Sequence, residues 1–127
     1  MRIARILAGE DGASRFSDGE VPLERLGLFP ELPPFLVTRL VGANPVKLFA
    51  TPAELRVADW HTAPERQFAV SLNGWVEYET SDGTVRRFNP GEVVLVEDTT
   101  GRGHITRFDE GEQWFLHIPV PDDWHLI

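Results

Sequence analysis

The sequence predicts an all-β domain, either a sandwich or a barrel, from three observations. From Val46 onward, short runs rich in Val, Leu, Phe and Trp recur at intervals of about 8–12 residues. Turn-forming residues separate these runs, and Asn73-Gly74, between two of them, is among the strongest short-range hairpin signals. Helical periodicity is weak, so we expect at most one helical turn, at Leu23–Leu28.

The first 45 residues are predicted to form an irregular N-terminal arm. Asp11-Gly12 and Asp18-Gly19 are turn formers, and three closely spaced prolines follow at positions 30, 33 and 34. Because proline fixes φ and restricts the residue before it, this cluster opposes a long helix. We expect the arm to wrap around the domain, or to supply an edge strand and a contact in a dimer.

Residues 46–120 are predicted to form the body of the fold, followed by a tail at residues 121–127. Ser81-Asp82-Gly83 and Asn89-Pro90-Gly91 supply further turns between strands. No repeat or linker divides the chain, and 127 residues suffice to bury one core, so we expect a single domain. The predicted strands are Val46–Thr51, Ala53–Trp60, Gln67–Leu72, Trp75–Thr80, Thr84–Phe88, Glu92–Glu97, His104–Phe108 and Gln113–Val120.

The composition argues against several classes of function. The net charge of −8 argues against nucleic-acid binding, because backbone phosphates are repelled. No window approaches the roughly 18 apolar residues that a membrane span needs. The absence of cysteine excludes disulfides and thiolate metal ligands. We therefore expect a cytoplasmic protein that binds neither membranes nor nucleic acids.

Two short motifs carry the candidate functional residues. His61, Gln67 and Gly74 are spaced as the first His, the Glu and the closing Gly of the pattern G-x5-H-x-H-x3-E-x6-G. Gly101 and His104 match the G-x2-H portion of a second pattern, G-x5-P-x-G-x2-H-x3-N. In these residues the chain resembles the cupin superfamily, and more closely a bacterial subgroup of single-domain cupins with no assigned reaction. The resemblance implies a double-stranded β-helix, a jelly-roll barrel, that forms homodimers.

The motifs depart from the family's pattern where a metal would be held. Ala63 replaces the second His and Gln67 replaces the Glu, so one imidazole and one negative charge are lost. The resemblance implies a divalent zinc, nickel or iron ion on His61, Gln67 and His104, whereas the depleted ligand set favours a site without metal. The candidate replacement ligands are His117, if its side chain faces the lumen, and Asp98 or Glu97, which come shortly before His104.

His61 and His104 are the candidate catalytic residues, because imidazole titrates near neutral pH and serves as a general acid or base. Small side chains on one face of the strand at residues 67–72 leave room for a ligand in the lumen. The candidate substrate-binding residues are Gln67, Ser71, Trp60 and Asp98.

Three functions stay open at this point. The first is an enzyme that uses the pocket for proton-transfer or metal-assisted chemistry on a small organic substrate, and the resemblance implies an isomerase, lyase, cyclase or dioxygenase-like reaction. The loss of one His and the Glu favours proton transfer over oxygen chemistry. The second is a non-catalytic binder or sensor of a small molecule, with a degenerate metal site. The third is a structural module that assembles through its edge strands.

Overall fold

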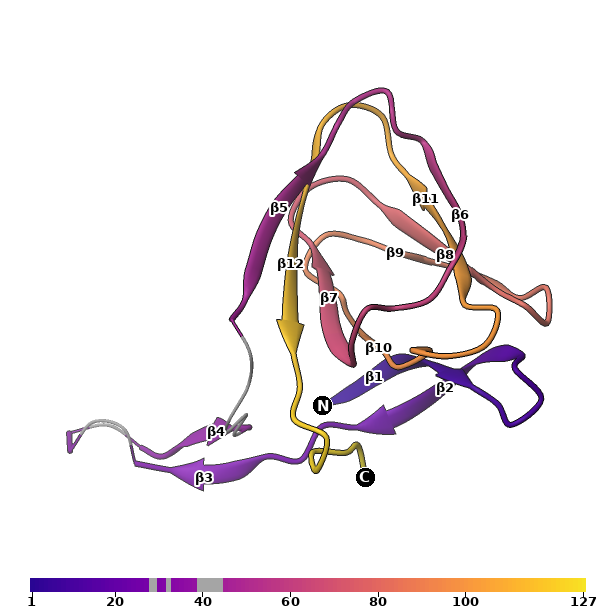
Figure 1. Ribbon diagram of the computed structural model, residues 1–127. Coiled ribbons are helices and arrows are strands. Elements are labelled where there is room, and N and C mark those ends of the chain that lie inside the picture. Colours follow the sequence, from indigo (N-terminus) through magenta and orange to yellow (C-terminus); the bar gives the residue numbers. More distant parts are fainter. Residues whose placement is uncertain (28–29, 32, 39–44) are drawn as a thin grey trace.

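Every regular element that the structure describes is a β-strand, which confirms the all-β prediction (Figure 1). The structure is a computed structural model, and it describes residues 1–27, 30–31, 33–38 and 45–127. Within these residues no helix is long and apolar enough to cross a membrane. The strands are β1 (Arg2–Ala8), β2 (Ser14–Glu20), β3 (Glu24–Leu26), β4 (Phe35–Val37), β5 (Lys47–Thr51), β6 (Val57–His61), β7 (Gln67–Ser71), β8 (Val76–Thr80), β9 (Val85–Phe88), β10 (Val93–Val96), β11 (His104–Phe108) and β12 (Gln113–Pro119).

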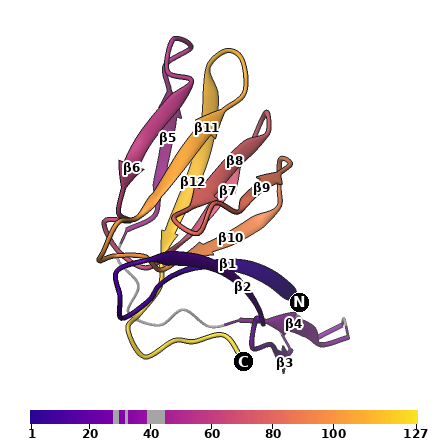
Figure 2. The same ribbon diagram turned by 90° about the vertical axis from the view of Figure 1, so that its right-hand side faces the viewer.

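Two sheets face one another as the layers of a sandwich (Figures 1 and 2). The larger, six-stranded sheet has the order β2-β1-β10-β7-β12-β5, and the four-stranded sheet has the order β6-β11-β8-β9. Strands β3 and β4 pair only with each other, in a hairpin that projects from the body of the domain. Among the described residues, the hydrogen-bonded ladders do not join the two sheets into a closed barrel.

From residue 47 onward the strands follow the sequence-based prediction closely. Seven of the eight predicted strands begin within one residue of the observed start. The exception is β6, which begins at Val57 rather than at Ala53. The residues before it form a turn instead, in which the Leu55 amide donates to the Pro52 carbonyl at 3.0 Å.

The irregular arm predicted for the N-terminus is wrong for the first twenty residues. Strands β1 and β2 form an antiparallel ladder of seven residue pairs, and β1 also pairs in parallel with β10. Strand β1 therefore lies inside the larger sheet with Ile3 and Ile6 buried, and only β2 takes the predicted edge position. The helical turn predicted at Leu23–Leu28 is a strand over Glu24–Leu26, while Leu28 lies outside the described residues.

The turn at Asn73-Gly74 does not close the predicted hairpin. It connects β7 to β8, and these strands belong to different sheets. The side chain of Asn73 gives the reason: its Oδ1 accepts a hydrogen bond from the Trp114 amide at 2.7 Å, and its Nδ2 donates to the Glu112 carbonyl at 3.0 Å. These bonds hold the turn against the start of β12, while the chain passes from the larger sheet to the smaller one. The predicted turn at residues 81–83 does join a hairpin, formed by β8 and β9.

The principal core lies between the two sheets. Its buried side chains include Ile6, Val94 and Phe115 from the larger sheet and Tyr78 and Phe108 from the smaller one. Since successive side chains of a strand point to opposite faces, alternate residues of β1, β10 and β7 remain for the outer face.

The C-terminal tail covers the outer face of the larger sheet. Phe68, Leu95 and Trp124 belong to a second buried cluster there, and the rings of Phe68 and Trp124 meet edge to face with centroids 5.2 Å apart. Burial of these apolar side chains stabilises the tail on the sheet. The tail is therefore part of the fold.

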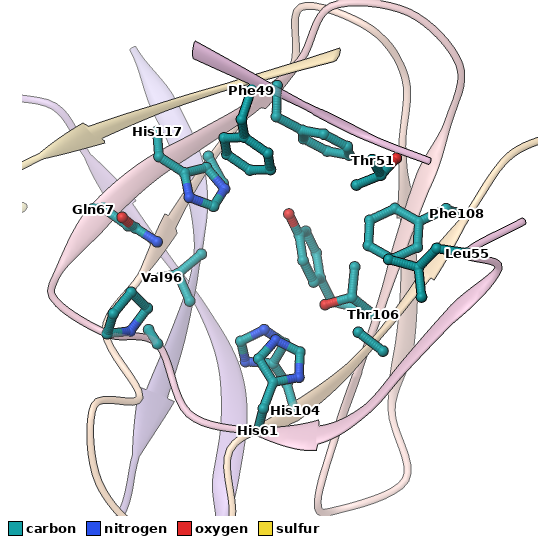
Figure 3. Close-up of a pocket in the computed structure, with 16 residues that line it drawn as sticks. Phe49, Thr51, Leu55, His61, Gln67, Val96, His104, Thr106, Phe108 and His117 are labelled. Atoms are coloured by element: carbon teal, nitrogen blue, oxygen red, sulfur yellow. The ribbon is translucent and has the colours of Figure 1, made fainter. Parts of the chain in front are cut away.

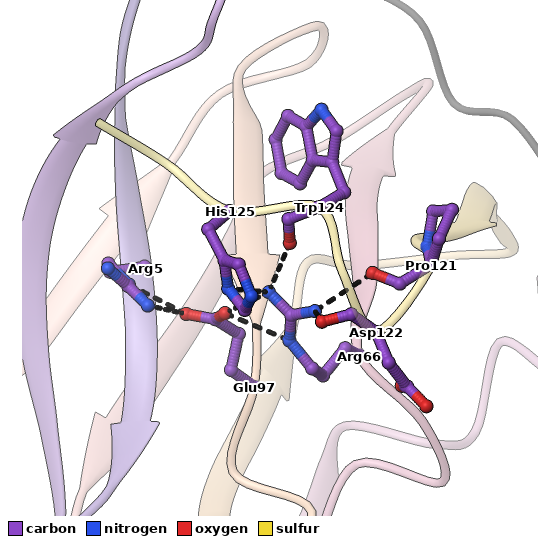
Figure 4. A network of polar contacts seen from close by, with 7 residues as sticks. All are labelled: Arg5, Arg66, Glu97, Pro121, Asp122, Trp124 and His125. Atoms are coloured by element: carbon purple, nitrogen blue, oxygen red, sulfur yellow. Dashed lines mark hydrogen bonds and ion pairs between the residues drawn. The ribbon is translucent and has the colours of Figure 1, made fainter.

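A polar network fastens this tail next to the strands that carry the site (Figure 4). Arg66 donates to the carbonyls of Pro121 at 3.0 Å and Trp124 at 2.8 Å, and forms an ion pair with Glu97 at 2.7 Å. Arg5 contacts the other carboxylate oxygen of Glu97, whose side chain is only 6% exposed. Charge-assisted bonds of this kind are short and directional, so the network fixes the ends of β7 and β10.

Gly103 allows β6 and β11 to approach closely where each strand carries a histidine. Its φ of +78° lies in the region that favours glycine. A Cβ atom at this position would overlap the carbonyl oxygen of His61. Because His104 is the register partner of His61 in the β6–β11 ladder, this approach sets the spacing of the two imidazoles.

We expect Gly103→Ala to lower the free energy of unfolding by about 3 kcal/mol or more, since it adds a backbone collision to the strain of a positive φ. Gly83→Ala is the matched control, because Gly83 has a φ of +86° but no atom within 4 Å of an added Cβ. It should cost only about 1–2 kcal/mol. Urea denaturation measures both values. Equal losses in the two variants would show that the close approach at Gly103 is absent.

Candidate functional site

A cavity of about 270 Å³ lies between the two sheets (Figure 3). The smaller sheet contributes His61 from β6, Tyr78 from β8 and His104 from β11, while the larger sheet contributes Gln67 from β7 and His117 from β12. Pockets for drug-sized ligands typically hold about 300–1,000 Å³, so a molecule that fills this cavity is small.

The described walls of the cavity are mostly apolar, with several aromatic rings, and their only ionisable side chains are three histidines and Tyr78. The rings of Phe49 and Phe115 stack with centroids 5.7 Å apart, and Phe108 meets Phe115 edge to face at 5.8 Å. Among the described residues that line the cavity there is no Lys, Arg, Asp or Glu. The chemistry of the site therefore depends on three imidazoles, a phenol, an amide and two threonine hydroxyls.

His104 is held rigidly by a buried carboxylate. Its Nδ1 lies 2.6 Å from Oδ2 of Asp98, and the two residues are 3% and 0% exposed. A carboxylate only accepts hydrogen bonds, so Nδ1 of His104 is the donor in this bond, and Nε2 is the other ring nitrogen of a side chain that lines the cavity. The other oxygen of Asp98 accepts no hydrogen bond from any described residue, so His104 is the principal partner of this buried carboxylate.

His61 lies beside His104 at the solvent-exposed rim of the cavity. The two ring centroids are 4.6 Å apart. The Nδ1 atom of His61 donates a hydrogen bond to the backbone carbonyl of Asp59 at 2.7 Å. The structure thus brings the two predicted catalytic residues together, with His104 buried and His61 open to solvent.

Tyr78 supplies a phenol next to this pair. Its ring meets the His104 ring edge to face, with centroids 5.5 Å apart, and its side chain is buried. Burial raises the pKa of Tyr78 far above its usual range, and the negative charge of Asp98 raises it further. The phenol therefore stays protonated and acts as a hydrogen-bond donor.

The opposite wall carries Gln67 and His117, which Figure 3 shows on the same side of the cavity. Gln67 is 2% exposed, and its Oε1 accepts no hydrogen bond from any residue that the structure describes. His117 packs edge to face against Phe49 at 4.7 Å. Burial lowers the pKa of His117 to about 4, with a smaller contribution from the charge of Lys47, so its imidazole is neutral at pH 7.

The remaining predicted binding residues lie outside the cavity lining. Ser71 is buried in the Asn73-Gly74 turn, where its hydroxyl donates to the backbone and accepts a hydrogen bond from the Gln113 amide at 3.0 Å. Trp60 is half-buried beneath the guanidinium of Arg102, at 4.3 Å from the ring centroid. Asp98 reaches the cavity only through His104.

The residues present do not make up a complete metal site. Among the described residues, no group of three or more His, Asp or Glu side chains converges that could hold an ion. Of the predicted set, His61 and His104 are adjacent, but Gln67 comes from the facing sheet beside His117. Two imidazoles fall short of the three protein ligands that catalytic zinc and non-haem iron sites require. No chemical step is therefore assigned to a metal.

No family model matches the chain, and no curated protein matches it. The resemblance to cupins therefore rests on the spacing of His61, Gln67 and His104 in the sequence. The expected homodimer likewise stays a prediction.

Three residues of the site were missed or left undecided from the sequence. Tyr78 alternates with polar residues on its strand, but a single tyrosine in a strand gives no signal that distinguishes a site from a core. Phe49 lies on a strand that the sequence predicts, but the sequence does not indicate that this strand pairs with β12. The direction of His117 does not follow from the sequence, because both faces of β12 are apolar, and the pairing of β12 with β5 and β7 turns it toward the cavity.

The lowered pKa of His117 predicts a loss of stability in acid. The unfolded chain takes up a proton at this group near pH 6.5, whereas the folded protein resists it down to about pH 4. Stability should therefore fall as the pH drops from 6.5 to 4, by at most about 3 kcal/mol from this residue, and the His117 contribution should level off below pH 4.

Urea denaturation of His117→Gln at several pH values tests this expectation, and the variant should lose that part of the slope between pH 6.5 and 4. His125→Gln is the matched control, because it also removes an imidazole, but one that lies in the tail and outside the cavity. A wild-type slope in His117→Gln would show that His117 is not held neutral by its surroundings.

Proposed function

We propose that this chain is a cupin-like protein that binds a small organic molecule between its two sheets. Three positions that match the cupin motifs, His61, Gln67 and His104, line the same cavity although they are far apart in the sequence. This convergence supports the resemblance, since ligand-binding positions of a jelly roll point into the space between its sheets.

We further propose that the protein is an enzyme that transfers a proton on its bound ligand, with His104 as the general base. The observation that carries this proposal is the 2.6 Å hydrogen bond from the His104 ring to buried Asp98. It leaves Nε2 as the basic atom in the cavity and stabilises the imidazolium that forms when Nε2 takes a proton. A base oriented in this way is prepared for catalysis before the ligand binds.

Each side chain around His104 has a separate part in this mechanism. Nε2 of His104 accepts a proton from the ligand, and Asp98 holds the ring and offsets the positive charge. The protonated phenol of Tyr78 donates a hydrogen bond to negative charge that develops on the ligand. His61, at the rim, exchanges protons with solvent. Return of the proton to a different atom makes the reaction an isomerisation, and departure of a leaving group makes it an elimination.

The alternative function is a binder that performs no chemistry. The apolar, aromatic walls favour it, because they supply affinity for a small molecule without acting on it. In this case the Asp98–His104 pair serves only to orient the ligand.

Solvent deuterium exchange distinguishes the two functions. Small carbonyl compounds with acidic C–H bonds, among them acetophenone, cyclohexanone and pyruvate, are incubated with the protein in D₂O, and mass spectrometry follows deuterium uptake. General-base catalysis contributes about 10²–10⁴-fold, so His104→Ala should lower the exchange rate of at least one compound by about a hundredfold. Asp98→Asn should lower it as well, because it removes the carboxylate that orients the ring.

His125→Ala is the matched control, since it removes an imidazole that lies outside the cavity, and it should exchange at the wild-type rate. Exchange that survives in His104→Ala would overturn the assignment of the base. Compounds that bind with no catalysed exchange would favour the non-catalytic binder.

A further inference from the structure

We infer that the cavity selects an uncharged aromatic molecule bearing a carbonyl-type hydrogen-bond acceptor, and that Gln67 is the residue that receives this acceptor. The inference rests on the proposed small-molecule site and names the class of its ligand. It assigns to Gln67 a binding role that does not involve a metal.

The charges around the cavity disfavour an anionic ligand. No described lining residue is a Lys or an Arg, so a carboxylate or phosphate inside would have no permanently charged cationic partner. The nearest negative charge, Asp98, stands directly behind His104 and repels anions. Arg66 and Lys47 do not compensate, because Arg66 binds Glu97 and the C-terminal tail (Figure 4), and Lys47 binds Glu65 at 3.2 Å. An unpaired charge in such a site binds weakly, because it loses its hydration and gains no partner.

His117 does not supply a cation either. It is the imidazole nearest Gln67 in Figure 3, and it lies against Phe49 and Phe115 on the same wall. Its pKa of about 4 keeps the ring neutral at pH 7. This end of the cavity therefore binds groups through hydrogen bonds rather than through charge.

The geometry of the walls favours a flat ring. Phe49 and Phe115 lie almost parallel, with an interplanar angle of 16°, and Phe108 presents its ring to Phe115 at 81°. Aromatic rings prefer these offset-stacked and edge-to-face arrangements, so the wall offers complementary surfaces to an aromatic ligand. The small volume limits that ligand to about the size of one substituted ring.

Gln67 is buried without the hydrogen bonds that a structural glutamine makes. The contrast is Gln113, whose Nε2 donates to the Ser71 hydroxyl at 3.0 Å and the Trp75 carbonyl at 2.9 Å, and whose Oε1 accepts from the Asp109 amide at 3.2 Å. Gln67 Oε1 accepts nothing from the described residues, and Figure 3 shows its amide nitrogen on the lumen side. Figure 3 shows the Nε2 group of Gln67 toward the lumen, where it can donate to a ligand oxygen, and the unpaired Oε1 on the side away from it.

This placement connects the ligand to the proposed base. A carbonyl oxygen bound at Gln67 directs the rest of the molecule across the cavity toward His104 (Figure 3). When Nε2 of His104 takes a proton from the carbon next to the carbonyl, the C–H electron pair forms a C=C bond and the carbonyl oxygen becomes an oxyanion. The Gln67 amide donates to that oxyanion, and return of the proton from His104 completes the cycle.

Three probes of nearly equal shape test the ligand class by NMR or calorimetric titration of the full chain at pH 7. Acetophenone is uncharged and carries the acceptor, benzoate carries a negative charge, and α-methylstyrene replaces the carbonyl oxygen by a CH₂ group. We expect acetophenone to bind at least tenfold more tightly than benzoate. Comparable affinity for benzoate would overturn the inference that the ligand is uncharged.

Gln67→Leu and Gln67→Met test the role of the amide. Each should lower the affinity for acetophenone relative to α-methylstyrene by about threefold to tenfold, the value of one hydrogen bond, while affinity for α-methylstyrene stays unchanged. Both variants should fold, because Oε1 accepts no hydrogen bond from the described protein, and thermal unfolding confirms this. An unchanged affinity ratio in the folded variants would overturn the role of Gln67.

The ligand class and the proton transfer by His104 can fail separately, because the titrations measure affinity and the deuterium experiment measures exchange. His104→Ala should still prefer acetophenone to benzoate even if it catalyses nothing. Selective binding without exchange overturns only the proton transfer. Exchange on charged compounds, together with tight binding of benzoate, overturns only the ligand class.

Discussion

The hydrogen bond between Asp98 and His104 is the contact on which the proposed chemistry of the cavity depends. Asp98 is completely buried, and a buried carboxylate is costly unless it is paired with hydrogen-bond donors. The backbone supports this position, because the Asp98 carbonyl accepts a hydrogen bond from the Ala63 amide at 3.1 Å. Glu97, the preceding residue, is fixed between Arg5 and Arg66 on the outer side. The orientation of the His104 ring thus follows from how the end of β10 is anchored.

The residues that anchor the outer face of the larger sheet are sequence neighbours of residues at the cavity on its inner face. Arg66 and Glu97 bind each other in the network beneath the C-terminal tail. Their sequence neighbours point the other way: Gln67 lines the cavity, and Asp98 binds His104, which also lines it. Alternation of side chains along the strands produces this division. Polar groups on the outer face therefore hold the backbone from which the site residues project, and the C-terminal tail contributes to the rigidity of the site.

Most strands after residue 47 could be located from the sequence, because turn residues and β-rich runs are local signals. The sequence was insufficient where a distant partner decides the outcome. Strand β1 enters the sheet by pairing with β10, and Asn73 redirects its turn by bonding β12. The spacing of the motifs placed His61 and His104 in one site. The role of Asp98 and the direction of His117 depend on packing between strands, which no local pattern encodes.

The tautomer of His104 tests the central claim most directly. Long-range ¹H–¹⁵N correlation spectra of the ¹⁵N-labelled protein at pH 7 distinguish a protonated ring nitrogen from one with a free lone pair. The hydrogen bond to Asp98 predicts a proton on Nδ1 and a free lone pair on Nε2, and this pattern should change in Asp98→Asn. A proton on Nε2 alone in the wild-type protein would contradict the account, because His104 would then have no basic atom facing the cavity.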